Sequence, residues 1–138
     1  MKEGYTTIEQ GKKLAEILPI ESADMYYTET IYREQMRITC TNWEVHLGLD
    51  KTIIDRHLYI IPCWSLAALL DVLIAKDFDP ETMFLRSTSD GRGTRLNNVW
   101  RLSVDRLDVD ITLRDIYAEN LVDACVEMIL KLHEQNLI

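Results

Sequence analysis

The sequence predicts an α+β fold in which a small antiparallel sheet packs against about three helices, as a single compact domain over residues 1–138. Two observations carry this prediction. Three stretches repeat apolar residues at helical spacing, and the stretches between them are rich in β-branched and aromatic residues. In addition, 138 residues with 47% apolar and 28% charged side chains have the size and composition of one ordinary globular domain.

The first predicted helix follows Thr7 and ends before Pro19. Thr7 and Gln10 have the spacing of a capping box, in which each side chain bonds the backbone of the other residue. Gly11 is unfavourable inside a helix by roughly 1 kcal/mol relative to alanine. Its presence therefore predicts that another part of the chain packs closely there.

Residues 23–49 predict strands, because they are rich in tyrosine, threonine and other β-formers. Residues 50–59 are interpreted as a connection, and whether it contains a short strand ending at Ile60 and Ile61 is left open. Residues 61–75 then form an almost unbroken apolar segment. We predict a buried helix here, with Pro62 in its first turn and apolar neighbours on most of its sides.

A hairpin is predicted from Leu85 to Val104, with a glycine-containing turn over residues 89–94. Past Asp105, apolar residues at 109, 111 and 113 alternate with polar ones, which predicts a third strand with one solvated face. The last predicted helix begins near Asn120, a favourable capping residue, and carries one apolar stripe. Glu127 and Lys131 are spaced for an ion pair on its other side.

The net charge of −8 argues against direct binding of nucleic acid or of an anionic membrane. We therefore predict neither partner. The start of the chain lacks the apolar run of a signal peptide, and residues 61–75 are too few to span a bilayer, so a cytoplasmic location is expected. The cysteines, Cys40, Cys63 and Cys125, have no paired spacing and are expected to be reduced.

The chain resembles a group of small, functionally uncharacterised proteins of phages and other mobile elements in gut bacteria. The residues that carry the resemblance are 7–14 (TIEQGKKL), 23–26 (ADMY), 62–70 (PCWSLAALL) and 120–128 (NLVDACVEM). It implies one α+β domain with a central and a closing helix, and no established activity. Cys63 stands where such proteins more often have alanine, which argues against a catalytic role for this residue, and Leu121 stands where proline is common.

We predict no catalytic, cofactor-binding or metal-binding residues. Cys40 and His46 are the best available thiol and imidazole pair but form no recognised signature. Asp105, Asp108 and Asp110 offer oxygen ligands for a hard cation but lack the pattern of a calcium loop. The run Gly91-Arg92-Gly93 joins two predicted strands, whereas a phosphate-binding loop joins a strand to a helix.

The predicted hairpin is the strongest candidate for contact with a partner. It gathers Arg92, Arg95 and Arg101, together with Arg86, within an acidic chain, and Trp100 lies beside Arg101. Arginine and tryptophan are enriched at protein interfaces. The candidate contact residues are therefore Arg92, Arg95, Trp100 and Arg101.

The leading hypothesis is a noncatalytic, cytoplasmic interaction or accessory protein of a mobile element, with an unknown protein partner and with homodimerisation through edge strands left open. One alternative is an acidic mimic of nucleic acid that binds a basic host protein. Another is a small enzyme or ligand-binding domain whose site includes Cys40 or His57 and is assembled from residues far apart in sequence.

Overall fold

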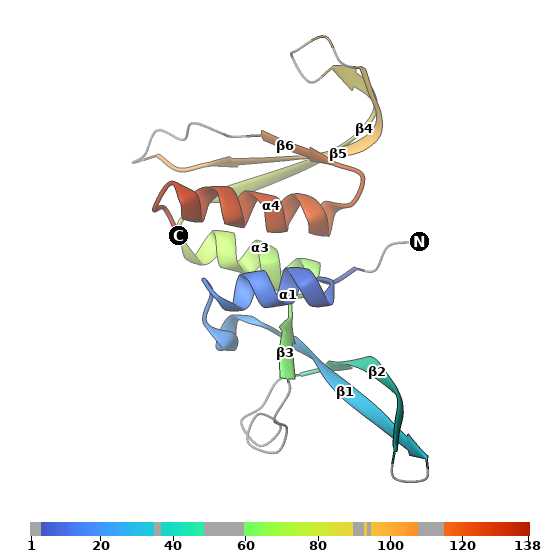
Figure 1. The fold of residues 1–138 in the computed structure, drawn as a ribbon. Helices are drawn as coiled ribbons and strands as arrows, with labels where there is room; N and C mark the ends of the chain where they lie inside the picture. Colours follow the sequence, from blue (N-terminus) through green and yellow to red (C-terminus); the bar gives the residue numbers. More distant parts are fainter. Residues whose placement is uncertain (1–3, 35–36, 49–59, 90–92, 94, 108–114) are drawn as a thin grey trace. The chain divides into compact units, whose positions relative to one another are not determined.

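The structure is a computed structural model that describes residues 4–34, 37–48, 60–89, 93, 95–107 and 115–138. Within these ranges it contains a short 3₁₀ turn, η1 (Ile20–Ser22), three α-helices and six strands: α1 (Ile8–Ala15), β1 (Met25–Glu34), β2 (Arg37–Leu47), β3 (Ile60–Cys63), α3 (Leu66–Ala75), β4 (Asp79–Ser89), β5 (Arg95–Asp105), β6 (Asp115–Ala118) and α4 (Leu121–Glu134) (Figure 1). The predicted α+β class and the three helices are confirmed.

The strands form two antiparallel three-stranded sheets, with the orders β2-β1-β3 and β4-β5-β6. The chain correspondingly divides into two compact units. We call Tyr5–Ser65 the N-terminal unit, and Leu66–Ile138 with the first four residues the C-terminal unit. That residues 1–138 form a single domain stays a prediction.

In the N-terminal unit, β1 is the central strand. Met25 is paired with Leu47 of β2 on one side and with Cys63 of β3 on the other. Met25, Tyr27, Ile61 and Cys63 form a buried cluster, and α1 packs against β3. The strands expected within residues 23–49 are therefore confirmed, whereas the connection expected over residues 50–59 lies outside the described residues.

The capping box predicted at the start of α1 is present. The Gln10 backbone N–H donates to Thr7 Oγ1 at 3.2 Å, and the Thr7 backbone N–H donates to Gln10 Oε1 at 2.9 Å. Gly11 faces β3, where a β-carbon would overlap the carbonyl oxygen of Pro62 and lie 3.1 Å from Ile61 Cγ2. The predicted close approach at Gly11 is confirmed, and β3 supplies the neighbour.

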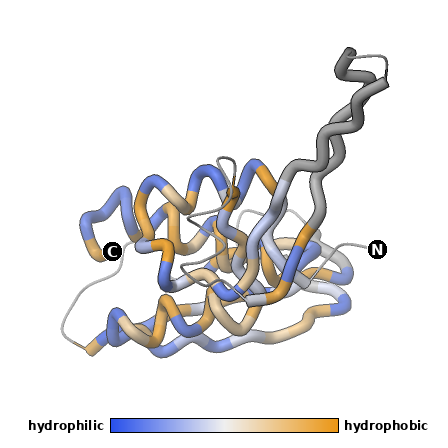
Figure 2. The backbone as a smooth tube through the Cα atoms, turned by 90° about the horizontal axis from the view of Figure 1, so that it is seen from below, coloured by the Kyte–Doolittle hydropathy of each residue, from blue (hydrophilic) through white to orange (hydrophobic). Residues whose placement is uncertain are grey.

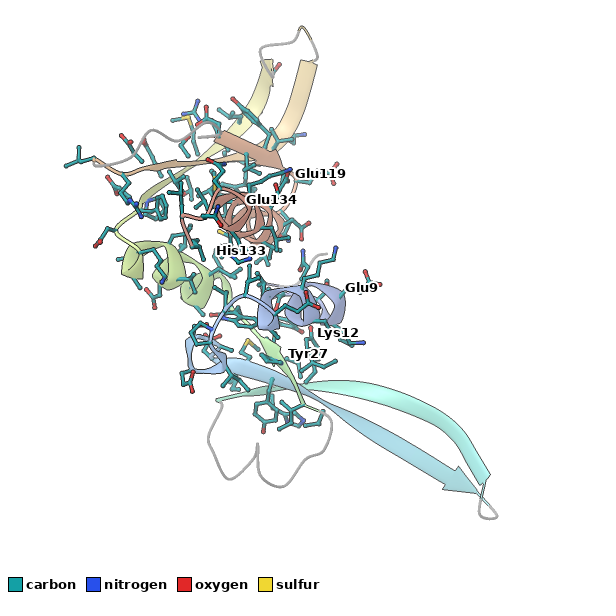
Figure 3. The ribbon with its side chains drawn as sticks, turned by 60° about the vertical axis from the view of Figure 1, so that its left-hand side comes forward. Glu9, Lys12, Tyr27, Glu119, His133 and Glu134 are labelled. Atoms are coloured by element: carbon teal, nitrogen blue, oxygen red, sulfur yellow. The ribbon has the colours of Figure 1, made fainter. Side chains whose placement is uncertain are left out.

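Thr6 ties the start of the N-terminal unit to the end of β3. Its backbone N–H donates to the Trp64 carbonyl at 2.9 Å, and its Oγ1 accepts from the Trp64 backbone N–H at 3.0 Å. The hydroxyl of Tyr27, which lies on the same side of β1 as α1 (Figure 3), donates to the Thr6 carbonyl at 2.7 Å. Trp64 is fully buried, and its indole N–H donates to Ser22 Oγ at 3.0 Å.

The prediction of one helix over residues 61–75 is wrong in its first part. Residues 60–63 form β3, and the helix begins only at Leu66. Pro62 therefore lies in an edge strand, where its missing N–H is tolerated, and not in a helical turn. The expectation that this helix is covered on most sides is also wrong, since Ala68, Leu69, Val72 and Leu73 are buried but Ile74 is 56% exposed.

In the C-terminal unit, α3 and α4 pack together and lie along one face of the β4-β5-β6 sheet (Figure 1). Hydrophobic and hydrophilic residues alternate along the helices in Figure 2, as expected for helices with one buried side. The predicted hairpin is confirmed as β4 and β5, with Ser89 paired to Arg95 at its far end. The strand expected over residues 109–113 lies outside the described residues, and β6 begins at Asp115.

The last helix starts as predicted. Asn120 Oδ1 accepts from the backbone N–H groups of Val122 and Asp123 at 2.7 and 3.3 Å. Figure 3 labels His133 and Glu134 in the last turn of α4. There Lys131 Nζ lies 3.8 Å from Glu134 Oε2, so Lys131 pairs with Glu134 and not, as predicted, with Glu127. The buried stripe contains Val122, Ala124, Cys125, Val126, Met128, Ile129 and Leu132. No helix among the described residues is long and apolar enough to cross a bilayer.

Candidate functional site on the β4–β5 hairpin

The structure describes two of the four predicted contact residues in full. Trp100 and Arg101 are neighbours in β5, and both are partly exposed. Arg95 is the first residue of β5, but its side chain is outside the described set, as is all of Arg92. Because side chains alternate along a strand, Trp100 and Arg101 face opposite sides of the sheet.

Trp100 lies on the face of the sheet that the helices cover, which we call the inner face. Leu102, Val104 and Ile116 on this face are buried, whereas Phe84, directly opposite Trp100, is 47% exposed. The Phe84 and Trp100 rings meet edge to face, with centroids 5.3 Å apart and planes inclined by 60°. The hairpin continues past the helices of its unit (Figure 1).

Arg101 lies on the opposite, outer face, between Met83 of β4 and Tyr117 of β6. Its Nη2 lies 3.6 Å from Met83 Sδ, and Met83 is 42% exposed. The guanidinium is thereby held across the strands beside an accessible thioether. Met83 and Phe84, neighbours in sequence, thus expose apolar surface on both faces of the same strand.

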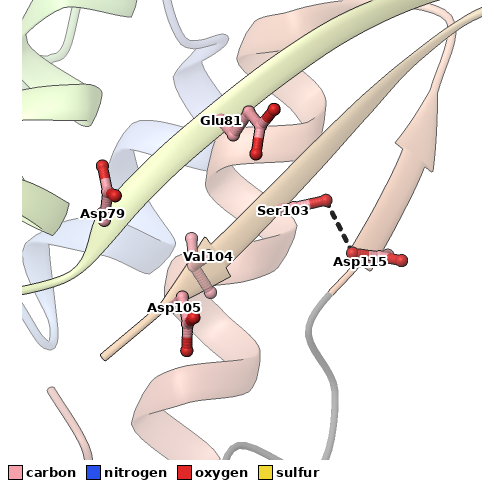
Figure 4. A pocket seen from close by; sticks show the side chains of 6 residues that line it. All are labelled: Asp79, Glu81, Ser103, Val104, Asp105 and Asp115. Atoms are coloured by element: carbon pink, nitrogen blue, oxygen red, sulfur yellow. Dashed lines mark hydrogen bonds between the residues drawn. The ribbon is translucent and has the colours of Figure 1, made fainter. Parts of the chain in front are cut away.

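The other end of the outer face is acidic. Asp79, Glu81, Ser103, Val104, Asp105 and Asp115 line an open hollow of about 240 Å³ (Figure 4). Ser103 Oγ donates to Asp115 Oδ1 at 2.6 Å, and Ser103 and Asp115 are paired across β5 and β6. No group of three or more His, Cys, Asp or Glu side chains within the described ranges is arranged to hold a metal ion.

Sequence reasoning selected Asp105 for this region but missed Asp79, Glu81 and Asp115. Together with Asp105 these residues come from three strands, and only the strand register brings them together. No local spacing in the sequence signals that arrangement. Asp108 and Asp110, which were considered with Asp105, lie outside the described residues.

Charge is unevenly distributed along the chain. Residues 82–101 hold four arginines and one aspartate, which leaves 11 basic and 22 acidic side chains in the rest of the sequence. Among the described side chains, Arg86 is exposed and Arg101 partly exposed. Residues 82–101 are therefore a basic segment of an acidic protein, whereas Asp79, Glu81 and Asp105 make the other end of the hairpin acidic.

The two cysteines whose side chains are described, Cys63 and Cys125, are free and buried, as expected. Burial raises the pKa of the Cys125 thiol to about 12. Burial also raises the pKa of the Cys63 thiol, whose sulfur is hydrogen-bonded to Thr6. Because the thiolate is the nucleophilic form, neither environment favours nucleophilic catalysis near neutral pH.

The side chain of Cys40 lies outside the described set, as does all of His57. His46 lies on the β1–β2 sheet, where its ring stacks on that of Tyr26 with the ring centroids 4.9 Å apart. Its Nε2 lies 2.9 Å from Thr28 Oγ1. This arrangement explains the position of His46 through contacts with neighbouring strand residues. It gives no support to a Cys40–His46 pair.

These features define an α+β protein in which an antiparallel hairpin carries two of the exposed large apolar side chains among the described residues, Met83 and Phe84, beside Trp100 and Arg101. Comparisons with protein-family models, curated proteins and solved structures gave no match.

Proposed function

We propose that this chain is a noncatalytic protein-interaction or accessory protein and that it contacts its partner through the β4–β5 hairpin. The observation that carries the proposal is the exposed pair Met83 and Phe84, at 42% and 47%, beside Trp100 and Arg101. Aromatic residues, methionine and arginine are the residue types enriched in protein interfaces. Exposed aromatic side chains that already pack edge to face offer a partner a rigid apolar surface.

The proposed cellular setting is the cytoplasm of a bacterium that carries a mobile element. The setting rests on the resemblance at residues 62–70 and 120–128. The biochemical proposal does not depend on it, because the hairpin surface has the same chemistry in any host.

The test is capture of partners by the tagged full-length protein in its natural host, followed by binding measurements with the purified partner. Three variants probe the hairpin: Phe84→Ser, Arg101→Ala and the double change Arg92→Ala with Arg95→Ala. Each apolar-to-polar and charge-removing change has a matched control outside the hairpin. Ile74→Ser alters an apolar side chain that is 56% exposed, and Lys12→Ala with Lys13→Ala removes two exposed positive charges.

We expect the hairpin variants to weaken binding by at least about tenfold, the effect of removing one interface side chain worth about 1.4 kcal/mol. The control variants should bind as the wild type does. A partner whose binding is unchanged in all three hairpin variants would contradict the proposal.

The acidic mimic of nucleic acid remains the second candidate, because Asp79, Glu81 and Asp115 share one solvent-facing hollow with Asp105. The same capture experiment separates the two. A basic partner that is lost when Asp79, Glu81 and Asp115 become Asn, Gln and Asn, but retained by the hairpin variants, would favour mimicry.

A further inference from the structure

Strand β4 is an edge of its sheet, since the described order is β4-β5-β6. It is long, spanning the 11 residues Asp79–Ser89. Exposed edges invite pairing with another strand, and natural proteins protect them with charges, prolines or short length. Asp79, Pro80 and Glu81 protect the beginning of β4 in this way, but Thr82 to Leu85 contain neither a charge nor a proline.

We propose that a second copy of this chain pairs with this edge, so that the β4 strands of two protomers run antiparallel about a two-fold axis at Phe84. The two sheets would then join into one. This inference rests on the proposed function, because it names the chain itself as a partner that uses the same hairpin surface.

The position of the axis follows from the length and sequence of β4. Phe84 is the middle residue of Asp79–Ser89, so a two-fold axis there pairs the two strands along their whole length. A symmetric antiparallel pair requires that residues opposite each other lie on the same face, which this register satisfies. The central pairs are Phe84 with Phe84, Met83 with Leu85, and Thr82 with Arg86.

These central pairs are compatible with a stable interface. Met83 and Phe84 are exposed in the single chain, and each would meet an apolar partner. Aromatic and apolar cross-strand pairs stabilise sheets, whereas like charges directly opposite each other destabilise them. No like charges face each other anywhere along the register.

Charge complementarity also selects the antiparallel arrangement. The strands β4 and β5 are acidic at one end, with Asp79, Glu81 and Asp105, whereas Arg86 and Arg95 lie in the other halves of the two strands. An antiparallel pair brings the acidic end of one protomer to the arginine-containing end of its partner. A parallel pair would instead place the two groups of carboxylates side by side.

Such pairing would close on itself. Each protomer uses its β4 edge, so the joined sheet would end at β6, which is a short strand of four residues that begins with Asp115. A short edge with a charged residue resists further pairing. The expected assembly is therefore a dimer and not a fibre.

The experiment is sedimentation velocity on the purified full-length protein from about 1 to about 200 µM, the range in which weak and moderate dimers dissociate. Two variants, Phe84→Lys and Phe84→Glu, each place like charges opposite each other at the two-fold axis. We expect each alone to raise the dimer dissociation constant at least about tenfold. Mixed together, they should form a heterodimer, because the Lys and Glu side chains then face each other.

Ile74→Lys is the control, since it adds the same charge at an exposed apolar position of α3 and should leave the dimer intact. Circular dichroism confirms that each variant is folded. A wild-type protein that is monomeric over the whole range would overturn the inference, as would a wild-type dimer whose Phe84→Lys and Phe84→Glu variants do not associate when mixed.

The outcomes separate this inference from the proposed function. If the wild type is monomeric but Phe84→Ser loses a host partner, the self-pairing is wrong and the interaction role stands. If the dimer forms through Phe84 while the hairpin variants retain every captured partner, the self-pairing stands and the wider interaction role fails.

Discussion

Gly11 of α1 lies so close to the carbonyl oxygen of Pro62 in β3 that no β-carbon fits between them. This contact allows α1 to pack against the edge strand of the N-terminal sheet. A residue that weakens its own helix therefore allows the helix to approach the strand.

We predict that Gly11→Ala destabilises the protein although alanine favours helices. The helical preference contributes roughly 1 kcal/mol in favour of alanine, whereas forcing a methyl group against the rigid backbone typically costs about 1–3 kcal/mol. The expected net effect is a loss of up to about 2 kcal/mol, measured by urea denaturation. Gly4→Ala is the control, because a β-carbon at Gly4 meets no atom within 4 Å. Equal stability of Gly11→Ala and wild type would show that the helix can move away from β3.

A second prediction concerns Thr6, the one buried polar residue described. Thr6→Val keeps the shape of the side chain but removes the oxygen that accepts from the Trp64 backbone N–H. A buried donor left without its partner costs about 1–3 kcal/mol. Tyr27→Phe should cost less, because the Thr6 carbonyl that loses the tyrosine hydroxyl also accepts from Cys63 Sγ at 3.5 Å. Chemical denaturation of both variants measures the difference, and the opposite order would contradict this account.

The cap at the start of α4 gives a third prediction. Asn120→Ala removes the oxygen that accepts from two backbone N–H groups and should lower the free energy of unfolding by about 1 kcal/mol. Asn120→Asp retains an accepting oxygen and should restore most of the stability. Thermal unfolding followed by circular dichroism tests both variants. An Asp variant as unstable as the Ala variant would show that the cap contributes little.

The sequence predicts local features well because their causes are local. The capping box of Thr7 and Gln10 and the cap at Asn120 depend on residues two or three positions apart, and the structure confirms them. The error at residues 61–63 has a physical origin. A continuous apolar run is compatible with a buried strand as well as a buried helix, and periodicity alone does not separate the two. Pro62, interpreted as a helix start, fits an edge strand equally well.

The candidate site was less accessible to sequence reasoning because it depends on pairing between strands. Trp100 and Arg101 were identified from their residue types, but Phe84 was missed, since its importance comes from lying opposite Trp100. Met83 was missed for the same reason, as its thioether meets Arg101 across the strands. Residue composition indicates which side chains suit an interface, while the register decides which of them meet.

The last prediction concerns Cys125, whose fully buried thiol has its pKa raised to about 12 from an ordinary value of 9.0. The folded state therefore retains the thiol proton at pH values where the unfolded state loses it. The resulting stabilisation is complete below pH 9 and is lost as the pH rises toward the folded-state pKa, by up to about 1.4 kcal/mol per pH unit.

Urea denaturation of wild type and Cys125→Ala at pH 8 and at pH 10.5 measures this effect. The alanine variant is less stable at pH 8, because it loses buried volume and leaves a cavity in the apolar stripe of α4. Its disadvantage should shrink at pH 10.5, since only the wild type carries the thiol whose ionisation favours unfolding. The other groups that titrate in this range are common to both proteins and cancel in the difference. A difference in stability that is the same at both pH values would show that Cys125 is more accessible to solvent than its burial indicates.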